Sequence, residues 1–355
     1  MRFFFRAISI AALACASTAA AVACNAKTTG GVNLAASPPA VAVTGAPDPA
    51  ASAQPPPSSD DAARGWAYAA IGCWIGGPYS EALGAIGDER TLADSRRCRA
   101  VVTGPLGGKD DDEKAIAAVR AMDEGVVKKV HDALAAATKD AALVALLDAS
   151  AAATREAMMA RRAAEALRRD DLAKDAAKSA EELKTQTNAL TARDALSKLA
   201  SLQGAYANEA QLFALILAAD HVEAARGLEP RAKILAASPG FDVAFSAPLP
   251  AGSMDAKPGD WLTYVTAAAK AAGHEVKIDA KATTHDREQA AFSGVAAGFA
   301  DKIEAIAGKL SDGEPKRVAT GYANRLRAEL DDAATRAKVK ADATKTTDDA
   351  AKKTK

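Results

Sequence analysis

Apolar residues recur every three or four positions over long stretches of this chain, a spacing that places them on one face of an α-helix. The strongest such pattern runs from Thr191, which begins a sequence similar to a capping box, to Gly227. We expect one continuous helix there, with Phe213 and Leu217 buried against a core. The apolar stripe consists of Leu196, Leu199, Tyr206, Ala210, Phe213, Ala214 and Leu217.

The same spacing predicts further helices on both sides of this stretch. Alanine is abundant and only 5% of the residues are aromatic, which favours helices packed closely through small side chains. We therefore expect an all-α fold, a multi-helix antiparallel bundle with short connections. Gly125 is expected to kink the first of these helices, and the third, rich in charge, is expected to be exposed. Their ranges are Asp110–Thr138, Ala141–Arg169, Asp171–Thr187, Trp261–Ala272, His285–Leu310 and Pro315–Lys338.

The stretch Ser238–Pro258 interrupts the helical pattern with repeated proline and glycine residues. It is expected to be the longest irregular segment of the folded body and to mark a seam between helical subdomains. The alternative is a binding or gating loop that exposes apolar side chains. In that case the candidate contact surface consists of Phe241, Phe245, Leu249 and Trp261.

The first 23 residues have the pattern of a secretory signal. Arginines near the N-terminus precede the apolar stretch Ala7–Ala23, which is too short and too weakly apolar for a lasting transmembrane helix. The last of these residues read Ala21-Val22-Ala23 and lead directly into Cys24. This order resembles a bacterial lipoprotein signal, and the resemblance implies cleavage before Cys24 and lipidation of its side chain. Because the next residue is Asn25 rather than Asp, the resemblance also implies the outer membrane.

An ordinary signal peptidase site is the alternative, because Ala21-Val22-Ala23 also fits an A-x-A cleavage motif. Residues 24–60 are rich in Ala, Pro, Ser and Thr, a composition that cannot bury a core and predicts a disordered tether. The helical domain is expected over residues 61–340, with a disordered tail at 341–355.

Two cysteines, Cys73 and Cys98, remain after the proposed processing. In an exported chain, an even pair is most simply a disulfide. Aromatic residues cluster around it, so we expect residues 66–102 to form a disulfide-tied helical cap at the N-terminal end of the domain. The alternative is an aromatic ligand groove near Trp74.

Charge and motifs exclude several classes of function. The chain has 45 basic and 45 acidic residues, which gives neither the basic footprint of a nucleic-acid binder nor a polybasic membrane patch. The turn Gly104–Asp110 lacks the spacing and the hydroxyl residue of a phosphate loop. His221 is expected at the surface or at a helix end, and no motif indicates a catalytic, cofactor or metal site.

These observations predict a lipid-anchored cell-envelope protein whose helical body is a binding or scaffolding module. Its partners would be the membrane, through the lipid at Cys24, and a protein or small molecule that the sequence does not identify. The alternatives are an exported enzyme of unrecognised type and a soluble secreted helical protein. A buried pocket with convergent polar groups would favour an enzyme or a small-ligand carrier, whereas a convex body with a solid core would favour a scaffold.

Overall fold

The computed structural model describes residues 59–109, 112–167, 175–277 and 281–328, without the side chains of 175–179. The chain divides into two units at Pro55–Pro56, and all of the described residues belong to the second unit. Throughout these ranges the chain forms helices and no strand, so the predicted all-α class is confirmed. Cys24, residues 24–58 of the predicted tether and the predicted tail at 341–355 lie outside the described residues.

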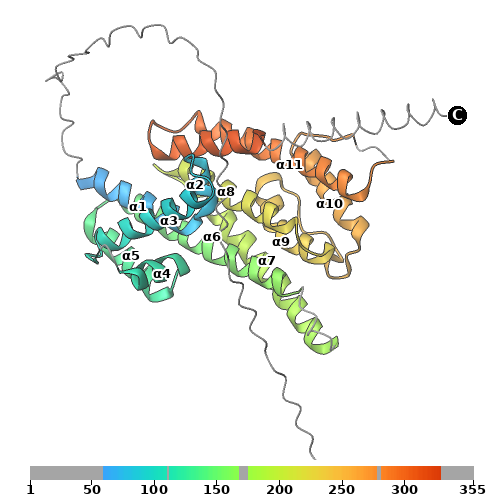
Figure 1. Cartoon of the computed structure of the whole chain (residues 1–355), viewed down its shortest axis with the longest axis horizontal. Coiled ribbons are helices and arrows are strands. Elements are labelled where there is room, and N and C mark those ends of the chain that lie inside the picture. Colours follow the sequence, from blue (N-terminus) through green and yellow to red (C-terminus); the bar gives the residue numbers. More distant parts are fainter. Residues whose placement is uncertain (1–58, 110–111, 168–174, 278–280, 329–355) are drawn as a thin grey trace, which may run out of the picture. The chain divides into compact units, whose positions relative to one another are not determined.

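Consecutive helices pack against each other (Figure 1). The connections from α7 to α8 and from α8 to α9 are short, at residues 201–206 and 226–229, whereas residues 246–257 and 272–283 form longer connections. Pro230 and Pro258 occupy first-turn positions, where the missing N–H is not needed. The helices are α1 (Ser59–Ile75), α2 (Gly77–Ala82), α3 (Asp88–Thr103), α4 (Glu113–Ala121), α5 (Glu124–Ala137), α6 (Ala141–Ala166), α7 (Asp175–Ala200), α8 (Ala207–Ala225), α9 (Pro230–Phe245), the 3₁₀ turn η1 (Ser253–Asp255), α10 (Pro258–Ala271), α11 (Thr284–Ala307) and a further helix over 314–328.

Helix α8 lies at the centre of the packing and contacts α6, α7, α9 and α11. Phe213 and Leu217 on this helix are buried, as the apolar stripe predicted. The Phe213 ring lies 6.4 Å from the ring of Tyr68 and 6.2 Å from that of Tyr79, measured between centroids. These contacts connect α8 to α1 and α2 in one core.

The N-terminal cap consists of α1, α2 and α3 and is fixed by the predicted disulfide. Cys73 and Cys98 are bonded, with their Cα atoms 5.1 Å apart, so α1 and α3 are covalently joined. Trp66 is buried between the two helices, where its indole N–H donates to the carbonyl of Val101 at 3.2 Å. The cap is therefore held by one covalent bond and by aromatic packing.

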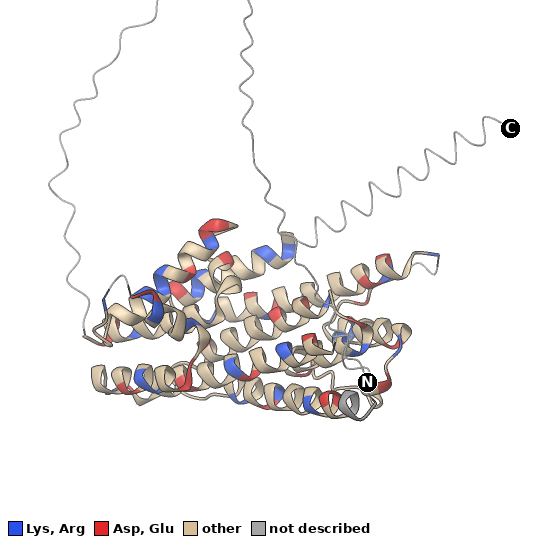
Figure 2. Cartoon of the chain, turned by 60° about the horizontal axis from the view of Figure 1, so that its bottom comes forward, with Lys and Arg blue, Asp and Glu red and all other residues tan. Residues whose placement is uncertain are grey.

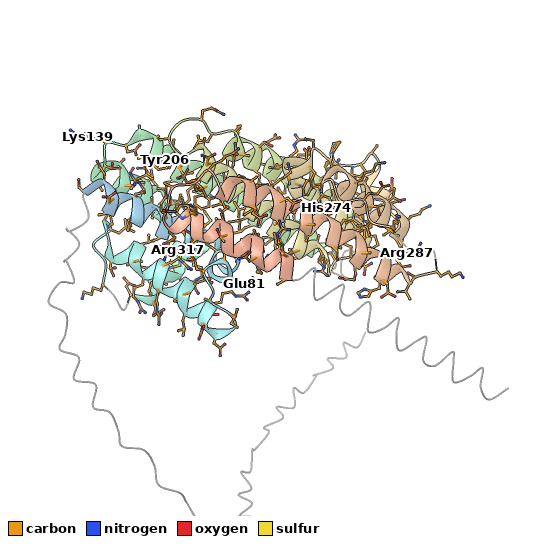
Figure 3. All side chains as sticks on the ribbon, turned by 90° about the horizontal axis from the view of Figure 1, so that it is seen from above. Glu81, Lys139, Tyr206, His274, Arg287 and Arg317 are labelled. Carbon is orange, nitrogen blue, oxygen red and sulfur yellow. A yellow bond between two sulfur atoms is a disulfide. The ribbon has the colours of Figure 1, made fainter. Side chains whose placement is uncertain are left out.

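Polar contacts join the cap to the C-terminal helix. The hydroxyl of Tyr79, which is fully buried, donates to Glu314 at 2.7 Å. Arg325 lies 3.3 Å from a carboxylate oxygen of Glu81 on α2 and 3.1 Å from one of Glu223 on α8. Glu81 is labelled in Figure 3, where it lies beside the C-terminal helix.

The irregular segment begins later than predicted: α9 continues to Phe245, and residues 246–257 lie outside the α-helices, with η1 among them. Pro239 lies inside this helix and lacks the N–H that would bond to the carbonyl of Leu235. The Ser238 hydroxyl donates to that carbonyl at 3.1 Å and replaces the missing bond. Gly240 packs so closely on α8 that a Cβ there would overlap the carbonyl oxygen of Ala218. The proline and glycine therefore serve helix packing instead of a loop.

The predicted contact surface is also wrong. Phe241, Phe245 and Trp261 are buried, and Leu249 is partly buried against the core. The Phe241 ring stacks on Trp261 with 6.3 Å between centroids, and Phe245 meets Phe299 edge to face at 4.8 Å. These side chains form the core between α9, α10 and α11. The apolar content of the segment is explained by packing and does not indicate a docking surface.

Two predicted helices are each divided in the structure. Residues 201–206 separate α7 from α8, so Thr191 lies inside α7 and its hydroxyl donates to the carbonyl of Thr187 at 3.0 Å. Met122 ends α4 in a left-handed conformation with φ 57°, and Gly125 lies in the first turn of α5. The break that was expected at Gly125 therefore occurs earlier, between α4 and α5. The predicted ranges of α6, α10 and α11 agree with the structure to within a turn.

The prediction that Asp171–Thr187 is a helix of its own is wrong, whereas the predicted exposure holds for part of its described side chains, among them Leu183, Lys184 and Thr187. From Asp175 onward this stretch is the first half of α7. Thr185 is buried, and its hydroxyl donates to the carbonyl of Glu181 at 2.7 Å. Helix α7 packs along α6, which covers one side of the charged segment.

Substitution of Phe213 by Ala is expected to lower the free energy of unfolding by about 3–5 kcal/mol, because it leaves a cavity in a fully buried site. Urea denaturation followed by circular dichroism measures the change. Leu183→Ala is the matched control, because the Leu183 side chain is 64% exposed. If the two variants lost the same stability, the assignment of Phe213 to the core would be contradicted.

Candidate functional site

A cavity of about 330 Å³ lies beneath the disulfide-tied cap. Its walls come from α1, the α1–α2 turn, α3, α6 and α8, with the last turn of α4 contributing one side chain. Trp74, Met158 and Leu217 supply apolar walls, and Cys73 of the disulfide also lines the space. The polar side chains that line it are Asp94, Arg120, Thr154, Arg161, Asp220 and His221.

Helix α8 contributes Asp220 and His221 at the end of an otherwise apolar run. His221 is buried, and its Nδ1 lies 3.0 Å from the backbone carbonyl of Ala236 on α9. Burial lowers the pKa of His221 to about 4, so the imidazole is neutral at pH 7 and donates from Nδ1. The expectation of a surface or helix-end histidine is wrong, because α9 covers this face of α8.

Asp220 faces Arg161 of α6 across the cavity wall, with 3.5 Å between the carboxylate and the guanidinium. Burial raises the pKa of Asp220 to about 6, although Arg161 acts in the opposite direction. Arg161 also contacts Glu165 at 3.1 Å on its own helix. The carboxyl group of Asp220 therefore binds a proton at higher pH than an exposed aspartate does.

Asp94 and Arg120 lie on the cap side of the cavity. Asp94 accepts hydrogen bonds from Ser80 and, at 3.4 Å, from Arg97, so its charge is already matched. Arg120 donates to the hydroxyl of Ser95 at 2.8 Å. The indole N–H of Trp74 is buried in the wall and has no acceptor among the described residues.

This set of side chains is suited to binding more than to a recognised reaction. Thr154 has the only hydroxyl side chain in the described lining, and it donates to the carbonyl of Ser150 at 2.8 Å within its own helix. No group of three or more potential metal ligands occurs within the described part of the chain. What the cavity offers is an apolar wall, part of which is the Trp74 ring, with guanidinium and carboxyl groups of its lining residues.

A second, smaller cavity of about 50 Å³ lies between α8, α11 and the C-terminal helix. Its lining includes Phe292 and Phe299, with Arg226 and Gln289 at its edge. This volume holds one or a few waters and no larger ligand. The cavity beneath the cap is therefore the better candidate for a functional site.

Comparison with protein-family models, curated proteins and solved structures found no match to this chain. Among the described helices, none is long and apolar enough to cross a membrane. Basic and acidic side chains are interspersed over the described helices (Figure 2). The cavity and the N-terminal sequence are therefore the two features of the chain that bear on its function.

The sequence placed only part of this site. Trp74, near which the sequence offered an aromatic ligand groove as an alternative, lines the cavity, but it is the single aromatic side chain in the described lining. Asp220 and Arg161 were not identified, because their pairing joins α6 to α8 over a long sequence separation. The available signal was a charged residue and a histidine side by side in the apolar run of α8, since such residues need partners when they are buried.

Asp220 and His221 are expected to affect acid stability in opposite directions. The pKa of Asp220 is raised from 3.8, so the group adds to the free energy of unfolding below that pH, and this stabilisation is lost as the pH rises through about 6. The pKa of His221 is lowered from 6.5, so the group adds to the free energy of unfolding above that pH, and this stabilisation is lost as the pH falls through about 4. Between these limits the two effects oppose each other.

We expect Asp220→Asn to lose more stability than the wild-type protein when the pH falls from neutral to about 4.5, and His221→Gln to lose less. The reason is that each variant removes one of the two opposing proton-binding groups. Urea unfolding at several pH values measures the slopes. Parallel pH profiles for all three proteins would show that neither group titrates as its surroundings predict.

Proposed function

We propose that this protein is an exported, lipid-anchored envelope protein whose helical body binds a small molecule in the cavity beneath its cap. The observation that carries the binding role is the cavity itself, of about 330 Å³. Its volume is at the lower end of the range for small-molecule sites, and an apolar wall with few polar groups is typical of such sites. A scaffold that works only through its outer surface does not require this internal space.

The anchoring role rests on the N-terminal sequence, where small residues lead into Cys24. A lipid on Cys24 would leave residues 25–58 as a spacer between the bilayer and α1. A lipoprotein carries several acyl chains, enough for firm attachment without a membrane-spanning helix. The proposed outer-membrane location follows from Asn25 in the same resemblance.

A substitution that fills the cavity should abolish ligand binding with little loss of fold. Ala157 lies in the cavity wall on α6, and Ala157→Leu places three additional carbon atoms there. Native mass spectrometry of protein extracted from its own envelope is expected to find a bound small molecule on the wild type and none on Ala157→Leu. The matched control is Ala152→Leu, because Ala152 is on the exposed side of the same helix.

The same measurement can contradict the binding role. Two results together would show that the cavity is not a binding site. The wild-type protein would carry no bound mass, and small molecules would shift its thermal unfolding no more than they shift that of Ala157→Leu. In that case the scaffold role would replace it.

Cys24→Ser is expected to move the protein from the membrane fraction to the soluble fraction of the envelope, because the lipid could no longer be attached. Fractionation of cells that express either form measures this change, and circular dichroism of the purified variant checks that the body stays folded. The Asn25→Ser variant is the control and should remain with the membranes. A Cys24→Ser protein that still sediments with membranes would refute the lipid anchor.

A further inference from the structure

We infer that the ligand of this cavity is a small organic anion with an apolar body, held with its charge at the cavity mouth and its body against Trp74 and Leu217. This inference rests on the proposed binding function and adds the chemical class of the ligand. It follows from the order of exposure along the wall and from the balance of charges around it.

The exposure of the lining residues gives the cavity a direction. Arg120 is exposed, and the Arg161 side chain is 45% exposed, so the guanidinium groups lie toward solvent. Trp74 and Leu217 are each only 5% exposed, so the apolar surface lies deep. A molecule that fits this arrangement has a polar group at one end and an apolar group at the other.

The charges favour an anion at the mouth. Asp94 is matched by Arg97 at 3.4 Å, and Asp220 is matched by Arg161 at 3.5 Å. Glu165 also contacts Arg161, but its side chain is 49% exposed and water weakens its effect. Arg120 bonds to a neutral hydroxyl, that of Ser95, and no carboxylate of the described residues forms an ion pair with it. The two Asp and two Arg side chains of the lining balance in number, but Arg120 is the one of the four that forms no ion pair within the described structure, so its charge is available to a ligand.

The hydrogen-bond donors that remain for a ligand are those of Arg120, which has further N–H groups beyond the one bonded to Ser95. The indole N–H of Trp74 is enclosed within the wall and is not one of them. His221 donates to a backbone carbonyl and is neutral, so it supplies no negative charge. A carboxylate, which only accepts hydrogen bonds, complements such a set.

Three aromatic probes of matched size and different charge test this inference: benzoate, benzamide and benzamidine. The chain contains three tryptophans, so its indole ¹⁵N–¹H spectrum has few peaks, and Trp74→Phe assigns the one that matters. In the full processed chain, millimolar benzoate is expected to shift the Trp74 peak in a saturable manner. Benzamide should bind about tenfold more weakly, because it lacks the charge that strengthens the contact with arginine.

Substitutions at the mouth identify the charged contacts. Arg120→Gln and Arg161→Gln are each expected to weaken benzoate about tenfold and to leave benzamide unchanged. Arg161→Lys keeps the charge and should retain most of the affinity. Arg162→Gln is the matched control, because Arg162 is the next residue of α6 and does not line the cavity.

The outcomes separate this inference from the function on which it rests. Equal binding of all three probes, or stronger binding of benzamidine, would overturn the anionic class and leave a small-molecule site in place. A Trp74 peak that no probe moves would overturn the inference. If protein from the envelope also carried no bound mass, the proposed binding function would be lost with it.

Discussion

The burial of α8 on all sides is the constraint on which the rest of this structure depends. A helix that is apolar around its whole circumference must be enclosed by other helices, and α6, α7, α9 and α11 enclose this one. Of the polar residues near its C-terminal end, His221 is buried, while 33% of the Asp220 side chain and 29% of the Glu223 side chain are exposed; each of the three has a partner inside the protein. Arg161 pairs with Asp220, the carbonyl of Ala236 accepts from His221, and Arg325 pairs with Glu223. The candidate site and the ion pairs of Arg325 that join the C-terminal helix to the cap and to α8 are therefore consequences of the same enclosure.

Small residues allow this enclosure to be tight. Gly240 brings α9 onto α8 at Ala218, and Gly321 brings the C-terminal helix onto the carbonyl of Ala82 in the cap, where a Cβ would overlap it. At both positions any larger side chain would have to push two helices apart. The scarcity of aromatic residues fits this arrangement, since small side chains allow close helix packing, and the large rings of Phe213 and Trp261 are fully buried.

The sequence predicted the helical class, the disulfide and the burial of Phe213, because each depends on local periodicity or on pairing by elimination. It did not predict that Pro239 lies inside a helix. That outcome depends on the hydroxyl of Ser238, which bonds to the carbonyl that the proline leaves free, and on close contact with α8. Local proline and glycine signals were outweighed by tertiary packing.

The polar site was harder to predict for a related reason. Trp74 is distinctive in the sequence because aromatic residues are few, whereas Arg161 is one charged residue among several on α6. Only the crossing of α6 over α8 places it opposite Asp220. Periodicity describes one helix at a time, so it identifies the buried face of α8 but not the residue of another helix that will neutralise a charge on that face.

The proposed export and the cavity beneath the cap are connected through one covalent bond, the Cys73–Cys98 disulfide. Cys73 lies in the cavity wall beside Trp74, and its bond to Cys98 holds that part of α1 to α3, which also carries Asp94. Such bonds form and persist in oxidising compartments outside the cytoplasm. The closed loop spans a sequence separation of 25 residues, and in the chain-entropy model its closure stabilises the fold by about 3.5 kcal/mol. A chain that acquires this bond only after export would gain the rigid wall of its cavity in the compartment where the proposed ligand is bound.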